Sequence, residues 1–157
     1  MKLVSSAFSH QGEIPAIYTC EGRNVSPPLS WSNMPENARS LALIVDDPDA
    51  PDPAHPKRPW VHWVLYNLPP MDGKLEEGAP QPPQGTLQGK NDWHRTGYGG
   101  PCPPIGRHRY LFKLYALDTP LADLSEPSKA TLQREMHDHV IGETMLMGTY
   151  QKATHKT

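Results

Sequence analysis

The sequence contains little cysteine: Cys20 and Cys102 are the two cysteines among its 157 residues. Two cysteines are too few for a disulfide-rich scaffold, and a single pair this far apart does not match a zinc knuckle. A long-range disulfide between them is one alternative. We expect instead two free thiols, as is usual for a protein of a reducing compartment.

Long apolar segments are also absent from the sequence. No stretch approaches the roughly 20 apolar residues of a membrane-spanning helix, and Met1–Ser6 does not begin an apolar segment of signal-peptide length. Together with the expected free thiols, these absences predict a cytoplasmic protein. A chain of 157 residues has the usual size of one domain, so we expect a single domain over residues 1–157.

The sequence has no excess of basic residues. Lys and Arg total 15, Asp and Glu total 17, the formal net charge is −2, and no five like charges occur in a row. A nucleic-acid-binding surface normally needs a clustered basic excess. The charge balance therefore argues against DNA or RNA as a partner.

Proline, in contrast, is abundant. The chain has 19 prolines and 12 glycines, and 16 of the prolines lie in residues 27–104. Proline removes a backbone donor and clashes with the preceding turn inside a helix. This composition excludes a helix bundle or a coiled coil, and it indicates stiff, non-helical loops in the middle of the chain.

Four segments have the composition of β-strands: residues 41–45, 61–67, 109–117 and 145–150. They are rich in β-branched, aromatic and other apolar residues, which favour extended chain. Shorter strands are expected at residues 5–8 and 30–31.

One helix is predicted near the C-terminus. Ser125–Pro127 offers a capping residue and an early proline, which the first turn of a helix tolerates. Leu132, Met136 and Val140 follow at four-residue spacing as one apolar stripe, and Gly142 is the expected end. The chain is therefore predicted to be mostly β, with one main helix and two long proline-rich loops.

Three polar residues, Asp47, His62 and His108, lie at the ends of the three strongest predicted strands. Side chains alternate across a strand with period two, so His108 shares the more apolar face of its strand with Tyr110. If the three side chains meet, the aspartate would fix the tautomer of one imidazole and favour its protonated form. The two imidazoles would then offer N–H donors to an anion, and the glycine-rich loop 97–101 would add backbone amides.

Each of these residues also has a structural interpretation. A histidine at a strand end commonly makes a structural hydrogen bond, and an aspartate before proline, as at Asp47, commonly forms a turn. Two histidines and a carboxylate also match a facial-triad metal site, but no short His-x-His or His-Glu-x-x-His spacing supports one. No Gly-x-Ser-x-Gly elbow and no phosphate-binding loop occurs in the sequence. We expect neither a metal nor a cofactor.

Several ordered motifs are similar to those of the phosphatidylethanolamine-binding protein family, in particular its short bacterial and archaeal branch, often labelled Raf-kinase-inhibitor-like. The matching segments are Cys20–Gly22, Asn24–Trp31, Ser40–Val45, Asp47–Pro51, Trp60–Trp63, Gly100–Pro104, Gly106–Tyr110 and Gly142–Tyr150. The resemblance covers nearly the whole chain. It implies the fold of that family, a β-sandwich around a central antiparallel sheet with a small anion pocket near one end.

The resemblance also implies which residues form the pocket. The family's lining residues correspond to Asp47, His62 and His108, the three residues at the predicted strand ends. It suggests three further lining residues: Trp60, Tyr98 and Pro101. The family pocket binds phosphate-like and carboxylate-like groups, including phospholipid head groups, and we expect the same ligand classes here.

One departure from the family concerns the C-terminus. Longer mammalian members end in an additional helix over the pocket mouth, whereas this chain ends in the polar tail 151–157. This difference weakens the expectation of kinase regulation and implies a more open pocket mouth. An exposed apolar rim with Trp63 or Trp93 is a candidate surface for the homodimer that short bacterial members are expected to form.

Three functions follow as hypotheses. The first is binding of a small anion, such as phosphate or a phosphorylated head group or residue, with modulation of a kinase or another signalling partner. The second is inhibition of a kinase or protease through the pocket rim. The third is hydrolysis, either metal-assisted or with His62 and His108 as general acid and base. We rank binding first, because no nucleophile is evident in the sequence.

Overall fold

The computed structural model describes residues 1–153, and the last four residues of the polar tail, His155 among them, lie outside the described residues. The elements in chain order are β1 (Lys2–Val4), the 3-10 helix η1 (Ala16–Tyr18), β2 (Leu29–Ser32), β3 (Ser40–Asp47), β4 (Trp60–Leu68), β5 (Gly73–Leu75), β6 (Leu87–Gln88), β7 (His108–Leu117), α1 (Lys129–Met136) and β8 (Val140–Tyr150).

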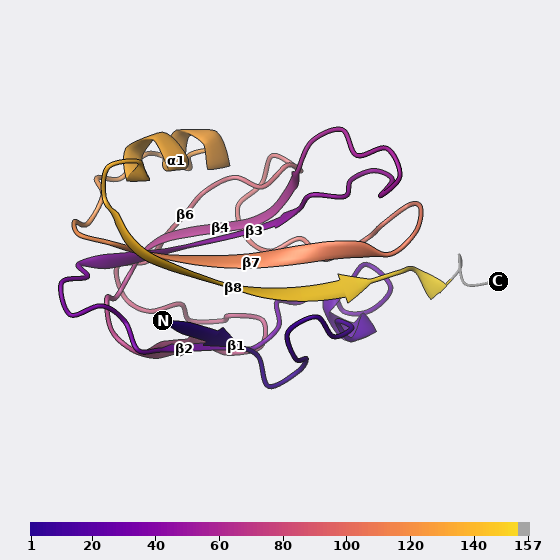
Figure 1. Ribbon diagram of the computed structural model, residues 1–157, viewed down its shortest axis with the longest axis horizontal. Helices are drawn as coiled ribbons and strands as arrows, with labels where there is room; N and C mark the ends of the chain where they lie inside the picture. The colour runs from indigo at the N-terminus through magenta and orange to yellow at the C-terminus, as the bar shows by residue number, and fades with distance from the viewer. Residues whose placement is uncertain (154–157) are drawn as a thin grey trace.

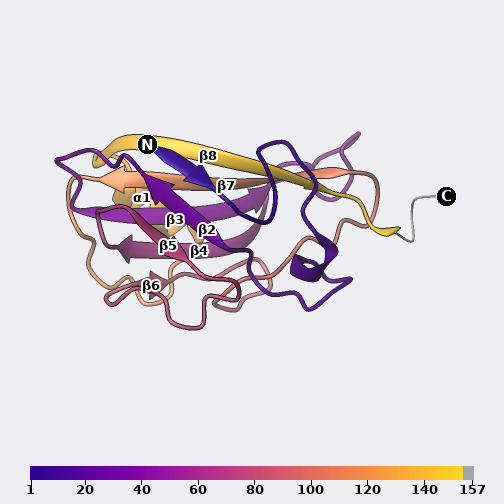
Figure 2. The same ribbon diagram turned by 90° about the horizontal axis from the view of Figure 1, so that it is seen from below.

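The strands form two antiparallel sheets that pack face to face. β1, β2 and β5 make a three-stranded sheet, and the larger sheet has the order β6-β4-β3-β7-β8. Figure 1 shows three layers, with α1 on one face of the larger sheet and the small sheet on the other. Figure 2 shows β1, β2 and β5 lying across the larger sheet. The predicted mostly β fold with one main helix is confirmed.

The central strand β3 is buried along its whole length. Leu41, Leu43 and Val45 face the core between the two sheets, whereas Ala42 and Ile44 belong to the apolar cluster under α1. Because alternate side chains point to opposite faces and both faces are covered, the strand must be apolar at successive positions. This explains the continuous apolar run in the sequence.

The predicted strands are confirmed with one exception. Residues 41–45, 61–67, 109–117 and 145–150 lie in β3, β4, β7 and β8, and residues 30–31 lie in β2. The strand expected at residues 5–8 was wrong, because the N-terminal strand β1 pairs with β2 through residues 2–4.

The helix begins later than the sequence predicted. Ser125 and Glu126 have φ angles of 59° and 55°, and this left-handed conformation is incompatible with the start of a helix. Ser128 is the capping residue instead, since its hydroxyl oxygen accepts the backbone N–H of Thr131. That side-chain bond satisfies a backbone donor that the first turn leaves free.

The helix also ends earlier than predicted, at Met136. Leu132 and Met136 are buried against the sheet, as the apolar stripe indicated. Val140 instead begins β8, opposite Leu117, so the predicted end at Gly142 was wrong: pairing with β7 takes this segment into the sheet. No helix within residues 1–153 is long and apolar enough to cross a membrane.

Cys20 and Cys102 form a disulfide, with Cα atoms 5.4 Å apart, so the prediction of two free thiols was wrong. The bond joins the turn after η1 to the proline-rich loop before β7. The backbone N–H of Cys20 donates to the carbonyl oxygen of Pro101 at 3.1 Å, which aligns the two segments. Because 82 residues separate the cysteines, their contact depends on the whole fold and not on local spacing.

Candidate functional site

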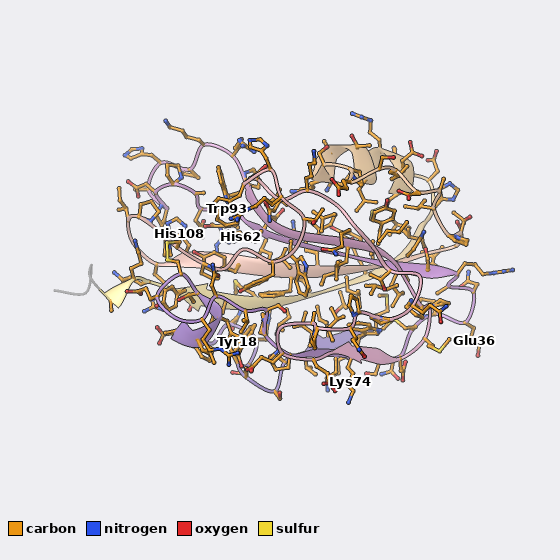
Figure 3. All side chains as sticks on the ribbon, turned by 180° about the vertical axis from the view of Figure 1, so that it is seen from behind. Tyr18, Glu36, His62, Lys74, Trp93 and His108 are labelled. Atoms are coloured by element: carbon orange, nitrogen blue, oxygen red, sulfur yellow. A yellow bond between two sulfur atoms is a disulfide. The ribbon has the colours of Figure 1, made fainter. Side chains whose placement is uncertain are left out.

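A pocket of about 350 Å³ lies at the ends of β3, β4 and β7, beside the two proline-rich loops. Four polar side chains line it, those of Asp47, His62, His108 and Tyr110, and most of the remaining lining is proline and tryptophan. Figure 3 shows His62, His108 and Trp93 gathered at one end of the molecule. The three polar residues singled out in the sequence therefore do lie together.

Asp47 combines the two interpretations that its sequence allowed. Its Oδ1 accepts the backbone N–H of Asp49 at 2.7 Å, as in a turn, and its Oδ2 accepts Nδ1–H of His108 at 2.6 Å. Asp49 in turn accepts two bonds from the Arg109 side chain, at 3.0 and 2.9 Å, and one from its backbone N–H at 2.9 Å. The two carboxylates of this motif thus hold the first two residues of β7 beside the pocket.

His108 uses both ring nitrogens within the protein. Nδ1 lies 2.6 Å from the Asp47 carboxylate, and Nε2 lies 2.8 Å from the carbonyl oxygen of Ile105. Both partners only accept, so the ring donates twice, which requires the imidazolium form. Burial alone would lower the pKa of His108, but the hydrogen bond and charge of Asp47 raise it above its ordinary value. The expectation that His108 offers an N–H to a ligand is therefore wrong for this geometry.

His62 is in the opposite state. Burial lowers the pKa of His62 and favours the neutral ring. Nδ1 lies 2.7 Å from the carbonyl oxygen of Gly99, so Nδ1 carries the hydrogen and Nε2 carries a lone pair. Nε2 makes no hydrogen bond to any described residue, yet it is not sealed from solvent, and it is accessible from the pocket that the ring lines.

Tyr110 is a lining residue that the sequence interpretation placed on the core-facing side of β7 without a role. Its side chain is 1% exposed, and its hydroxyl is a buried polar group without a hydrogen-bond partner in the described part of the chain. Burial raises the pKa of Tyr110, so the phenol keeps its hydrogen. Its signal in the sequence was its phase: it follows His108 by two residues and points to the same side of the strand.

Aromatic rings fix the orientation of His62. The ring centroid of Trp93 lies 5.1 Å from that of His62 and the centroid of Tyr110 lies 5.3 Å from it, both edge to face. Trp60 packs edge to face against Trp93 at 5.6 Å and also lines the pocket. The His62 ring is therefore held between two aromatic neighbours, which opposes a ring flip.

Two predicted lining residues lie outside the pocket lining. The hydroxyl of Tyr98 donates to the carbonyl oxygen of Tyr18 at 2.8 Å, and its ring packs against Trp63, which is 3% exposed and so forms no exposed rim. Pro101 is buried, and Cys102, Pro103 and Pro104 take the lining position expected for it.

Two backbone amides of the glycine-rich loop are already bonded within the protein. The backbone N–H of Gly99 donates to the carbonyl oxygen of His62, and that of Gly100 donates to Oδ1 of Asn24. These two amides tie the loop to β4 and to Asn24, and they are not free for an anion.

The described residues contain no group of three His, Cys, Asp or Glu side chains arranged to hold a metal ion. His108 in particular has both nitrogens engaged, and a ligating imidazole needs a free lone pair. The geometry does not assemble the facial triad that two histidines and a carboxylate had suggested.

The fold and pocket define a class of protein: a β-sandwich with a buried Asp–His pair at one end of its central sheet. The family model described as phosphatidylethanolamine-binding protein matches residues 4–151. The chain belongs to this family.

Its relatives include bacterial and archaeal proteins. The chain is 50% identical over 155 residues to a UPF0098 protein of Methanothermobacter thermautotrophicus, covering 97% of this chain and 99% of that one. A phosphatidylethanolamine-binding protein homolog from Chlamydia trachomatis, CT736, superimposes with a TM-score of 0.88 at 46% identity, covering 96% of both chains. Escherichia coli YbcL gives a TM-score of 0.86 at 30% identity, covering 96% and 98%.

Proposed function

We propose that this protein binds a small oxyanion in the pocket formed by Asp47, His62, His108 and Tyr110. The observation that carries the proposal is the Tyr110 hydroxyl, a buried donor with no partner in residues 1–153. Burying a polar group without a hydrogen bond costs free energy, and a ligand oxygen at this position would satisfy it. His62 Nε2, accessible from the same pocket, supplies a second polar contact.

The size of the pocket favours a small ligand. Its volume of about 350 Å³ lies at the lower end of the range of about 300–1,000 Å³ for small-molecule sites. A phosphate-like or carboxylate-like group, free or on a phospholipid head group, suits this volume better than a whole phospholipid does. The proline and tryptophan walls would then contact the organic part of the ligand.

The test compares two tyrosine variants. Tyr110→Phe removes the unpartnered hydroxyl, so we expect phosphate affinity to fall about 10-fold or more while the unliganded protein keeps its stability, since no bond is lost. Tyr66→Phe is the matched control, because the Tyr66 hydroxyl accepts the backbone N–H of Leu124 at 3.0 Å within the apolar cluster under α1. It should lose about 1 kcal/mol of stability and keep its phosphate affinity.

Isothermal titration with phosphate and urea unfolding would measure both quantities. Equal phosphate affinity for wild type and Tyr110→Phe, or no measurable affinity of the wild type, would remove the proposal. Loss of affinity in both tyrosine variants would also contradict it, because the effect would then follow general destabilisation.

The other sequence hypotheses stay predictions. Modulation or inhibition of a kinase or protease, and a homodimer, would use the pocket rim. Trp93 lines the pocket, and Ile105, which follows the lining residue Pro104, is 54% exposed. A His-dependent hydrolase would have to rely on His62, since His108 is fully engaged. The cytoplasmic location stays a prediction as well, and the Cys20–Cys102 disulfide argues against it, because disulfides persist mainly in oxidising compartments.

A further inference from the structure

The pocket has an unusual charge balance for an anion site. Asp47 and His108 form an ion pair whose charges cancel, and both His108 donors are consumed by Asp47 and the Ile105 carbonyl. Arg109, the nearest cation along β7, is bound to Asp49. An incoming anion therefore meets the lone pair of His62 Nε2, beside the buried hydroxyl of Tyr110, and it meets no uncompensated cation among the residues that line the pocket.

A lone pair and an anionic oxygen repel each other unless a hydrogen lies between them. The tautomer of His62 leaves no alternative, because Nδ1–H is bonded to the Gly99 carbonyl at 2.7 Å and the Gly99 N–H is bonded back to the His62 carbonyl at 3.0 Å. Trp93 and Tyr110 hold the ring edge to face on two sides. The ring therefore cannot present its existing N–H to the ligand without breaking this set of contacts.

We propose that an oxyanion binds here with one proton shared between His62 Nε2 and a ligand oxygen, so that the pocket selects phosphomonoesters over phosphodiesters. This rests on the proposed function. A phosphomonoester monoanion carries a P–O–H that donates to Nε2, while another of its oxygens accepts the Tyr110 hydroxyl. A phosphodiester has no such hydrogen, and the proton must come from solvent onto a buried ring.

The surroundings of His62 determine how much free energy it takes to protonate the ring from solvent. Burial is the main effect and lowers the pKa of His62, while the hydrogen bond to the Gly99 carbonyl and then the charges of Asp47, Asp46 and Asp92 act in the other direction. The remaining titratable groups that line the pocket are His108, already an imidazolium, and Tyr110, a neutral phenol. Phosphomonoesters lose their second proton at a pKa of about 6, so their own hydrogen is available at mildly acidic pH.

Proton counting by isothermal titration tests the inference on the wild-type protein. The probes are phosphoethanolamine, a monoester, and glycerophosphoethanolamine, a diester with the same amine, each in two buffers of different ionisation enthalpy. At about pH 8, above the monoester pKa of about 6, we expect uptake of about one proton per phosphoethanolamine, and at about pH 5.5 about a quarter of a proton. Affinity should fall about tenfold per pH unit above the monoester pKa and more gently below it.

The diester should take up about one proton at about pH 8, and it should bind more weakly than the monoester at pH 5.5, because its proton must come from solvent onto a ring whose pKa burial lowers. If the pocket instead bound the monoester dianion against a neutral His62, a proton would be released at pH 5.5 and affinity would rise with pH. That result, or equal affinity for the two probes, would overturn the inference and leave anion binding intact. Failure of phosphoethanolamine to bind at all would remove the proposed function itself.

A histidine variant gives an independent readout. His62→Gln places a permanent amide N–H near the position of Nε2, so it should bind the diester without proton uptake and lose the preference for the monoester. His137→Gln is the matched control, since the His137 side chain is 78% exposed at the end of α1, and it should behave as the wild type does. Thermal melting would establish that both variants fold, and the wild-type proton counts decide the question if His62→Gln does not.

Discussion

The disulfide between Cys20 and Cys102 makes a quantitative prediction about stability. It closes a loop across a sequence separation of 82 residues, and a cross-link of this span removes conformational entropy from the unfolded chain. The chain-entropy relation gives about 4.5 kcal/mol at 25 °C for a loop of this size. Native domains are stable by about 5–15 kcal/mol, so this single bond would supply a large share of the total.

The perturbation is the double variant Cys20→Ser/Cys102→Ser, which removes the cross-link with a small change in side-chain volume. For a domain of this size we expect the melting temperature to fall by about 10–18 °C. With a urea slope of about 2 kcal/mol/M, the unfolding midpoint should fall by about 2 M. Both cysteines are exposed at the surface, so their replacement leaves the core intact, and the loss should come from the unfolded state.

Reduction of the wild type provides the control. Wild type treated with a reductant should match the double variant, and the double variant should not respond to reductant. A difference below about 1 kcal/mol between oxidised and reduced wild type would refute the reasoning, because it would mean that the unfolded chain already keeps these segments together.

Two further predictions concern the pocket. The pKa of His108 in the folded protein is raised above its ordinary value of about 6.5. Its contribution to stability is therefore complete below about pH 6.5 and is lost as pH rises through the folded pKa, by at most about 1.4 kcal/mol per pH unit. Urea unfolding at a series of pH values should show this decline in wild type and not in His108→Gln, and a wild-type profile without it would contradict the imidazolium assignment. Gly99→Ala would place a Cβ 2.3 Å from the Trp93 ring, so Trp93 must move from His62, with a stability loss of about 1–3 kcal/mol and weaker phosphate binding by titration. An unchanged near-ultraviolet circular dichroism spectrum and an unchanged phosphate affinity would contradict this prediction, because they would show that the Trp93 side of the pocket accommodates the added methyl group.

Much of the sheet was predictable because the signals for strands are local. The apolar run 41–45 and the alternation in 109–117 each depend on a few neighbouring residues, and both became central strands. The helix boundaries were less predictable: the left-handed φ angles at Ser125 and Glu126 and the pairing of Val140 with Leu117 outweighed a regular apolar spacing. Such choices depend on which partner segment offers the better burial.

The position of the pocket was also partly predictable. Asp47, His62 and His108 end three strands that are neighbours in the larger sheet, so period-two alternation was enough to suggest that they face one region. Their roles as hydrogen-bond donors to an anion were less predictable, because the residue type alone does not show which donors already bond to other parts of the protein. Both histidines were expected to offer an N–H to a ligand. His108 Nε2 instead bonds to the Ile105 carbonyl, which leaves that imidazolium fully engaged. His62 Nδ1 bonds to the Gly99 carbonyl, which leaves a lone pair on Nε2.

Residue order and composition determined a mostly β chain, its main strands, its family and the three polar residues at one end of the sheet, since each of these follows from short-range patterns or ordered motifs. Tertiary structure alone decided the rest. The Cys20–Cys102 bond joins segments 82 residues apart. The Tyr110 hydroxyl has no hydrogen-bond partner because none of the residues packed around it places a donor or acceptor within reach. Hydrogen-bond saturation and long-range contacts are properties of the packed chain, and no local pattern contains them.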